Sequence, residues 1–149
     1  MPLHVRPGSV ADVDVIADFN QRLAFESEGK TLDPEILRRG VAAMLADPSK
    51  GLYFVAEDDG VLVGQASVTY EWSDWRNGWV WWLQSVYEGS DARRRGVFRA
   101  LYDHICRAGR DAGAIGLRLY VERNNATAQA TYQALGMEPM PFLLLGRML

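Results

Sequence analysis

The sequence predicts an α/β fold, a mixed sheet in which an antiparallel meander is followed by βαβα units, with helices on both faces. The hairpin signal Asp58-Asp59-Gly60 joins two strand-like runs, which predicts the meander. Beyond the third strand, helix-like and strand-like segments alternate, which is typical of βαβα units. With 149 residues the chain has the length of one typical domain, and we expect a single domain over residues 1–149.

The N-terminal half reads as a strand, two helices and the meander. Leu3–Arg6 is a short strand, and Ser9 caps the helix that follows it. Asp33-Pro34-Glu35 starts the second helix, with Asp at the cap, Pro at the first helical position and an acid in the first turn. The three strands of the meander are predicted at Gly51–Glu57, Val61–Glu71 and Trp79–Tyr87.

The C-terminal half alternates between helix and strand. Arg94–Ala112 is helical, with apolar residues on one face and arginines on the other. Gly116–Glu122 is strand-like, and Asn125–Leu135 is a short helix that Gly136 ends in a left-handed turn. Phe142–Leu145 is predicted to form the last strand.

Composition and charge narrow the class of protein. Hydrophobic residues make up 48% and charged residues 23%, as in soluble globular domains. The net charge of −3 supplies no positive field, so we expect neither nucleic acid nor a membrane as partner. A single cysteine, no signal-like start and no apolar run of roughly 20 residues favour a cytoplasmic protein. Two isolated histidines and one cysteine give no metal-ligand spacing, so no metal is expected.

An arginine-rich loop precedes the long helix and carries the first functional signal. Arg93, Arg94 and Arg95 are followed by Gly96, directly after a strand and before the helix. The first N–H groups of a helix are unpaired and carry partial positive charge, so they bind anions. Glycine admits a ligand close to the backbone, and guanidinium groups suit phosphate oxygens. The alternative is a solvated helix start with an arginine-rich face.

A second segment places Asn125, Ala128 and Tyr132 near one face of the short helix. Together the two segments resemble the GNAT superfamily of acetyl-CoA-dependent N-acetyltransferases. Residues 93–98 are similar to its Arg/Gln-x-x-Gly-x-Gly/Ala pyrophosphate loop, and residues 125–137 resemble its later Asn…Ala…Tyr…Gly-Phe helix. The order and separation of the segments also fit, so the resemblance spans nearly the whole chain.

The resemblance implies acetyl-CoA as co-substrate, without a metal, and direct attack of an amine on the thioester. It implies that Tyr132 is the general acid that protonates the CoA thiolate. The cofactor-binding residues that it implies are Val86, Tyr87, Glu88, Arg93, Arg94, Arg95, Gly96, Val97, Phe98 and Asn125. Two of these depart from the family pattern: Phe98 stands in place of Gly or Ala, and Glu88 in place of an aliphatic residue.

The base and the acceptor site are predicted from the residues around the meander loop. Glu71, at a strand end, draws a proton from the acceptor through water or attracts a cationic substrate; the alternative is a solvated loop acid. Aromatic faces beside carboxylates suit a cationic amine. We therefore expect the acceptor pocket to include Trp72, Asp74, Trp75 and Glu26. The tryptophans at 79, 81 and 82 are core or interface, and an exposed tryptophan strand would indicate a homodimer.

These observations predict an enzyme that transfers an acetyl group to a primary amine of a small molecule or peptide. One alternative is a non-catalytic acyl-CoA-binding or sensing module of the same fold. Another is a nucleotide-phosphate-binding domain of a different fold, but the chain lacks a Gly-x-x-x-x-Gly-Lys-Ser/Thr segment.

Overall fold

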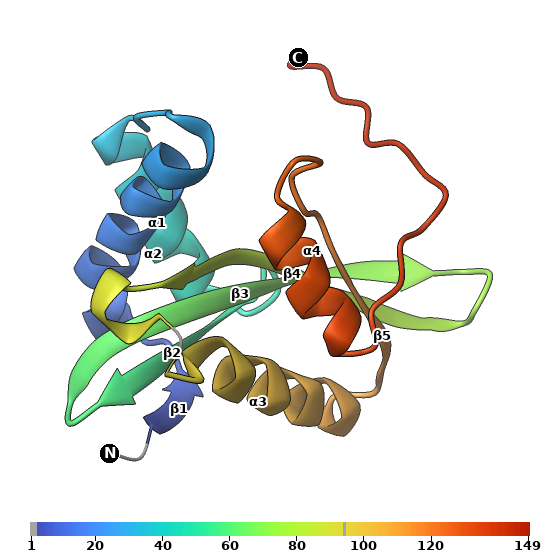
Figure 1. Ribbon diagram of the computed structural model, residues 1–149, viewed down its shortest axis with the longest axis horizontal. Coiled ribbons are helices and arrows are strands. Elements are labelled where there is room, and N and C mark those ends of the chain that lie inside the picture. The colour runs from blue at the N-terminus through green and yellow to red at the C-terminus, as the bar shows by residue number, and fades with distance from the viewer. Residues whose placement is uncertain (1–2, 94) are drawn as a thin grey trace. The chain divides into compact units, whose positions relative to one another are not determined.

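The computed structural model describes residues 3–93 and 95–149. They fall into two compact units, Met1–Leu119 with the sheet and Tyr120–Leu149 with a single helix (Figure 1). Arg94 lies outside the described residues, so its assignment to the cofactor loop stays a prediction.

The first unit is built on a five-stranded mixed sheet in the order β1-β2-β3-β4-β5. Four strands form an antiparallel series, and the fifth runs parallel to β4. The bounds are β1 (Leu3–Pro7), β2 (Leu52–Asp58), β3 (Val61–Ser73), β4 (Gly78–Glu88) and β5 (Ala114–Leu119). The predicted α/β class, with its meander and parallel addition, is confirmed. The strand predicted at Gly116–Glu122 is β5, which ends at Leu119, three residues earlier than predicted.

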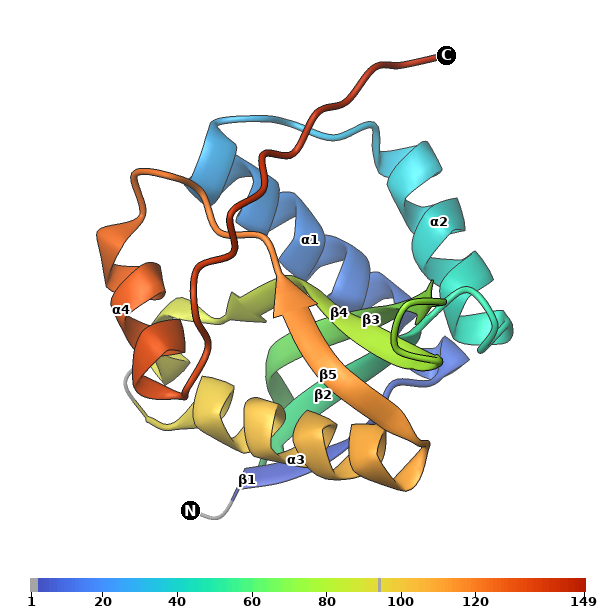
Figure 2. The same cartoon turned by 90° about the vertical axis from the view of Figure 1, so that its right-hand side faces the viewer.

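Helices cover both faces of this sheet, as predicted. A 3-10 turn, η1 (Val10–Asp12), leads into α1 (Val13–Glu28), and α2 (Pro34–Ala46) follows. Figures 1 and 2 show α1 and α2 on one face and α3 (Val97–Asp111) on the opposite face. A second 3-10 turn, η2 (Ser90–Ala92), connects β4 to the loop before α3.

Local sequence signals account for the start of α2 and for the first hairpin. The carboxylate of Asp33 accepts hydrogen bonds from the backbone N–H of Glu35 at 2.9 Å and of Ile36 at 3.1 Å. Between β2 and β3, Asp59 (φ 54°) and Gly60 (φ 79°) both adopt the positive φ that a two-residue hairpin turn requires. Both predictions are confirmed.

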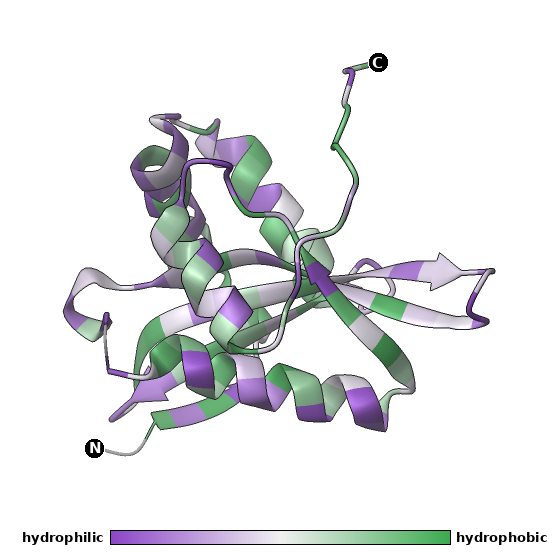
Figure 3. Ribbon diagram, turned by 45° about the vertical axis from the view of Figure 1, so that its right-hand side comes forward, coloured by the Kyte–Doolittle hydropathy of each residue, from purple (hydrophilic) through white to green (hydrophobic). Residues whose placement is uncertain are grey.

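The core consists of two clusters, one on each face of the sheet. Since β2 alternates its side chains, Phe54 and Ala56 join one cluster, and Tyr53 and Val55 join the other. The first cluster packs against α3 and the second against α1 and α2. Figure 3 shows the two-sided character of α3, whose apolar residues alternate with hydrophilic ones.

A glycine lets α3 begin close to the sheet. A Cβ added to Gly64 of β3 would lie 2.6 Å from Cγ1 of Val97 and 3.1 Å from the carbonyl oxygen of Tyr87. Val97 is the first residue of α3 and is fully buried. Only glycine leaves room for this packing, which fixes the start of α3 beside the end of β4.

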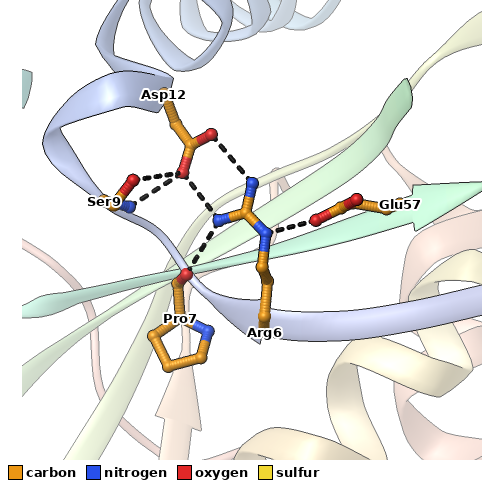
Figure 4. A network of polar contacts seen from close by, with 5 residues as sticks. All are labelled: Arg6, Pro7, Ser9, Asp12 and Glu57. Carbon is orange, nitrogen blue, oxygen red and sulfur yellow. Dashed lines mark hydrogen bonds and ion pairs between the residues drawn. The ribbon is translucent and has the colours of Figure 1, made fainter. Parts of the chain in front are cut away.

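An ionic cluster joins β1, β2 and the turn η1 (Figure 4). Arg6 donates to both oxygens of Asp12, at 2.8 and 2.9 Å, and to the carboxylate of Glu57. The N–H and the hydroxyl of Ser9 also donate to Asp12. The carboxylate of Asp12 therefore caps the N–H of Ser9, and the predicted cap by the serine hydroxyl does not form. The guanidinium of Arg6 holds the pKa of Asp12 below its usual range, against the opposing effect of burial.

The second unit contains α4 (Ala126–Ala134) and an extended C-terminal segment. Oδ1 of Asn125 caps the helix by accepting from the N–H of Ala128 at 3.1 Å, and Gly136 follows it at φ 92°. The strand predicted at Phe142–Leu145 is wrong, because no strand forms there and its side chains are 71–88% exposed. An apolar run has the composition of a strand, but it becomes one only when another strand pairs with it.

In the described part of the chain, no helix has both the length and the apolar character needed to span a membrane.

Candidate active site

The N-terminus of α3 has the features of an anion site. Its N-cap residue, Gly96, has a left-handed backbone (φ 79°, ψ 15°), and no side chain caps the helix. The carbonyl of Gly96 accepts from the N–H of Ala100 at 3.0 Å, which begins the helical ladder. The N–H groups of the first turn have no partner within the helix, so they are suited to bind oxygens of an anion.

Two arginines of the predicted cofactor loop are engaged with carboxylates. Arg93 pairs with Glu26 of α1, and its Nε also donates to the carbonyl of Glu88 at 3.3 Å. Arg95 pairs with Asp58 at the end of β2. Asp58 is more buried than its partner Arg95. Arg93 and Glu26 are both about half exposed, and an ion pair of this kind contributes only about 0–1 kcal/mol. A phosphate group therefore competes with Glu26 for Arg93 at little cost.

Tyr87 ties α1 to the end of β4. Its hydroxyl donates to Oε2 of Glu26 at 2.8 Å, and its ring lies 5.3 Å from that of Phe19. The guanidinium carbon of Arg93 lies 5.8 Å from the centre of the same ring. Burial and the carboxylate of Glu26 raise the pKa of Tyr87. The hydrogen bond from Arg93, which is the larger cause, and the hydrogen bond from Tyr87 both lower the pKa of Glu26. Glu26, Tyr87 and Arg93 thus form one connected group, which we call the Glu26 cluster.

Within the described residues, the end of β4 has a strand on one side only. Pairing with β5 stops at Leu83↔Leu119, whereas β4 continues to Glu88. Pairing with β3 on the other side extends to Gly64↔Glu88. Residues 84–88 therefore form a local sheet edge, to which an extended ligand with amide groups can add as a strand does.

A β-bulge interrupts β4 inside this edge. Gln65 pairs with Tyr87 and Ser67 with Gln84, so β3 advances by two residues while β4 advances by three. Ser85 within the bulge has φ 51°, the left-handed conformation that residues with a Cβ rarely adopt. Such a conformation costs on the order of 1–3 kcal/mol and persists only where its surroundings hold it. The sequence analysis missed this bulge, because no local sequence pattern marks it.

Glu71, the predicted base, has a partner on each carboxylate oxygen. Oε1 accepts from the indole N–H of Trp82 at 2.9 Å, and Oε2 accepts from Arg118 of β5 at 3.1 Å. Arg118 also lies over the ring of Trp82, 5.9 Å from its centre. A carboxylate held in this way is an oriented group on the sheet surface rather than a solvated loop acid.

The remaining predicted acceptor residues lie at the far end of the β3–β4 hairpin. Trp75 is 91% exposed, and Trp72 packs edge-on against Trp79 with ring centres 5.1 Å apart. Nine residues of β3 separate the pair Gly64↔Glu88 from Ser73↔Gly78, or about 30 Å of strand. The hairpin tip, including Asp74, is therefore not brought together with Glu26, which contacts the other end of β4. Of the other tryptophans, Trp81 is a core residue as predicted, and Trp82 holds Glu71.

One of the two departures from the family pattern, Phe98, has a local explanation, and nothing in the structure explains the carboxylate of Glu88. The ring of Phe98 packs on Tyr102, one turn further along α3, with ring centres 5.9 Å apart. Phe98 keeps its backbone N–H at the start of the helix, because every residue except proline carries this main-chain donor. Glu88 is half-buried, and its carbonyl accepts from Arg93.

Asn125 and Tyr132 belong to the second unit, where Asn125 is the N-cap of α4 and Tyr132 is half-buried on the same helix. Their assignment to the cofactor and to proton transfer stays a prediction. Among residues 3–93 and 95–149, no group of three or more His, Cys, Asp or Glu side chains is arranged to hold a metal ion.

Comparison with known proteins identifies the family. The model of the acetyltransferase (GNAT) family matches residues 16–137. A possible acetyltransferase from Clostridium difficile is 41% identical, with a TM-score of 0.91 and a match that covers 100% of this chain and 99% of that one. No curated protein matches the chain. The chain belongs to the GNAT acetyltransferase family, whose members use acetyl-CoA.

Two more distant structures share the fold. One, from Clostridium acetobutylicum, is described as a predicted acetyltransferase with acetyl-CoA; it has 15% identity, a TM-score of 0.80 and coverage of 97% of this chain and 96% of that one. The other is a ribosomal-protein-alanine N-acetyltransferase from Brucella melitensis, with 16% identity, a TM-score of 0.81 and coverage of 99% of both chains.

Proposed function

We propose that this protein is an N-acetyltransferase that moves the acetyl group of acetyl-CoA to a primary amine of a small molecule or peptide. The observation that carries the proposal is the side-chain-free N-terminus of α3 beside the unpaired edge of β4. The first is suited to a pyrophosphate, and the second to the amide groups of a pantetheine arm.

Acetyl-CoA, when bound, supplies the thioester. A backbone N–H group of Val86–Glu88 that faces the open edge then stabilises the negative charge that develops on its carbonyl oxygen. The amine must be neutral to attack. Glu71 receives the proton of the amine through a chain of waters, because Glu71 pairs with Val80, six residues or about 20 Å of strand from Val86. As the new C–N bond forms and the C–S bond breaks, Tyr132 gives its phenolic proton to the leaving sulfur, and the second proton that the nitrogen loses passes through water to the tyrosinate.

Two regions compete as the acceptor site. The hairpin tip offers Trp72, Asp74 and Trp75, whose exposed aromatic faces and carboxylate suit a cation. Glu26 lines an open hollow of about 260 Å³ on α1, together with Asp18, Gln21, Arg22, Phe25 and Thr31. Because about 30 Å of strand separates the two ends of the β3–β4 ladder, a small amine contacts one region and not the other.

We also propose that the protein forms a homodimer. The segment 142–149 supports this, because its large apolar side chains, including Phe142–Leu145, are at least 71% exposed. Figure 3 shows this run as hydrophobic. Contiguous exposed apolar surface is typical of an interface. A single monomer mass over a hundredfold concentration range would remove this proposal.

Calorimetric titration with acetyl-CoA, with ATP as control, tests the cofactor, and a panel of primary amines tests the reaction. Micromolar-range binding of acetyl-CoA without binding of ATP, followed by acetylation of an amine, is the expected result. Binding without turnover on any amine would favour the alternative of an acyl-CoA-binding or sensing module. Equal binding of ATP would favour a nucleotide-phosphate site instead.

A further inference from the structure

A buried amide from the neighbouring strand contacts the bulge in β4. Gln65 is fully buried, and its Nε2 donates to the carbonyl oxygen of Ser85 at 3.1 Å and to Oδ1 of Asn20 at 2.9 Å. A backbone carbonyl only accepts hydrogen bonds, so the NH2 side of the amide must face the bulge. Asn20 is itself fixed, because its Nδ2 donates to the hydroxyl of Tyr53 at 3.0 Å.

This arrangement is costly for the core. Within the described residues, Oε1 of Gln65 is buried without a hydrogen-bond partner. An apolar side chain of the same size would avoid that cost, since an unpaired buried polar atom loses its hydration without compensation. Stability alone does not account for a glutamine at this position, whereas contact with a strained backbone does.

The bulge lies directly before the residues that the proposed function places at the thioester. Ser85 precedes Val86–Glu88, and the pairing of β4 with β5 ends two residues earlier, at Leu83. An extra residue in a strand reverses the alternation of its N–H and C=O groups beyond that point. The conformation of Ser85 therefore decides which backbone groups of Val86–Glu88 face the unpaired edge.

We propose that Gln65, supported by Asn20, is a positioning residue that holds Ser85 in its left-handed conformation and so decides which N–H group of Val86–Glu88 faces the open edge and the thioester oxygen. The inference rests on the proposed function. Gln65 touches neither substrate, and it acts through the backbone of β4.

Gln65→Met tests the inference, because methionine keeps the length of the side chain and removes both donated hydrogen bonds. We expect kcat to fall about 10- to 100-fold, in line with the effect of misplacing an oxyanion donor, while KM for acetyl-CoA changes less than about threefold. Gln65→Leu repeats the test with another shape, and thermal melting verifies that each variant is folded.

Rescue by glycine separates positioning from general packing. Glycine adopts positive φ without steric cost, so Ser85→Gly in the Gln65→Met background should recover most of the lost kcat. Ser85→Ala removes the same hydroxyl but keeps a Cβ, and it should not rescue. Asp59→Gly is the matched control, because it relieves a similar positive φ (54°) in the β2–β3 turn and should not rescue either.

Amide hydrogen exchange gives a readout that does not depend on activity. In Gln65→Met, exchange of the backbone N–H groups that pair β3 with β4 on either side of the bulge should rise at least tenfold, and Ser85→Gly should reverse the increase. Unchanged kcat and exchange in Gln65→Met would overturn the inference, as would rescue by Asp59→Gly to the same extent. If the wild type acetylates no amine, the proposed function fails, and the exchange data still decide whether Gln65 holds the bulge.

Discussion

Substitutions of Gly96 test the anion site directly, because an effect on stability can be separated there from an effect on cofactor binding. The φ of 79° at Gly96 penalises any residue with a Cβ, but an added Cβ would meet no heavy atom of the described residues within 4 Å. Replacing Gly96 therefore costs only the torsional strain, about 1–2 kcal/mol. For a domain of this size that corresponds to a loss of roughly 2–8 °C in Tm. Gly96→Gln and Gly96→Glu should share this loss, since they have the same shape.

The two variants should differ in cofactor binding. A carboxylate about 7 Å from one phosphate charge, at an effective dielectric constant of about 20, costs roughly 2 kcal/mol. Gly96→Glu should therefore bind acetyl-CoA about 30-fold more weakly than Gly96→Gln at low salt, and the gap should narrow as salt screens the charges. Calorimetry of both variants measures the gap, and melting curves verify the matched stability. Equal affinities would refute the placement of the pyrophosphate at the start of α3.

Three further outcomes are expected. Tyr132→Phe should lower kcat about 10²- to 10⁴-fold with little change in acetyl-CoA affinity; unchanged turnover in a steady-state assay would remove the tyrosine from proton transfer. Of Trp75→Ala and Glu26→Gln, only the variant at the true acceptor region should raise the acceptor KM, and an unchanged KM in both would exclude both regions. Asp12→Asn should lower the free energy of unfolding by about 1–3 kcal/mol at pH 7. Because Arg6 depresses the pKa of Asp12, this difference is present above pH 4 and should shrink as the pH falls below it. Urea titrations at pH 7 and pH 3 measure it, and an equal difference at both would contradict the reasoning.

Local signals predicted most elements of the fold. The start of α2 at Asp33-Pro34 and the Asp59-Gly60 turn depend on neighbouring residues alone, and both are confirmed. The strand predicted at Phe142–Leu145 failed because pairing needs a partner that the local pattern does not specify.

The candidate site was less accessible to sequence reasoning. Tyr87 and Arg93 meet Glu26 across 61 and 67 residues of chain, and no spacing rule covers such distances. The left-handed backbone of Ser85 has no local signature either, because serine is not a residue that favours positive φ. The motif Arg93–Phe98 was recognisable because its function depends on contiguous backbone at one helix start.

The Glu26 cluster couples the binding of acetyl-CoA to the binding of the acceptor amine. Arg93 pairs with Glu26 in the structure. The family resemblance implies that Arg93 binds the cofactor, and Glu26 belongs to one of the two proposed acceptor regions. An ammonium group that binds Glu26 weakens its hold on Arg93, and a pyrophosphate that binds Arg93 frees Glu26. Each ligand then increases the affinity for the other by the same factor, because linkage is reciprocal. With an exposed ion pair as the coupling element, the factor is about two- to fivefold, which favours the ternary complex without enforcing an order of binding.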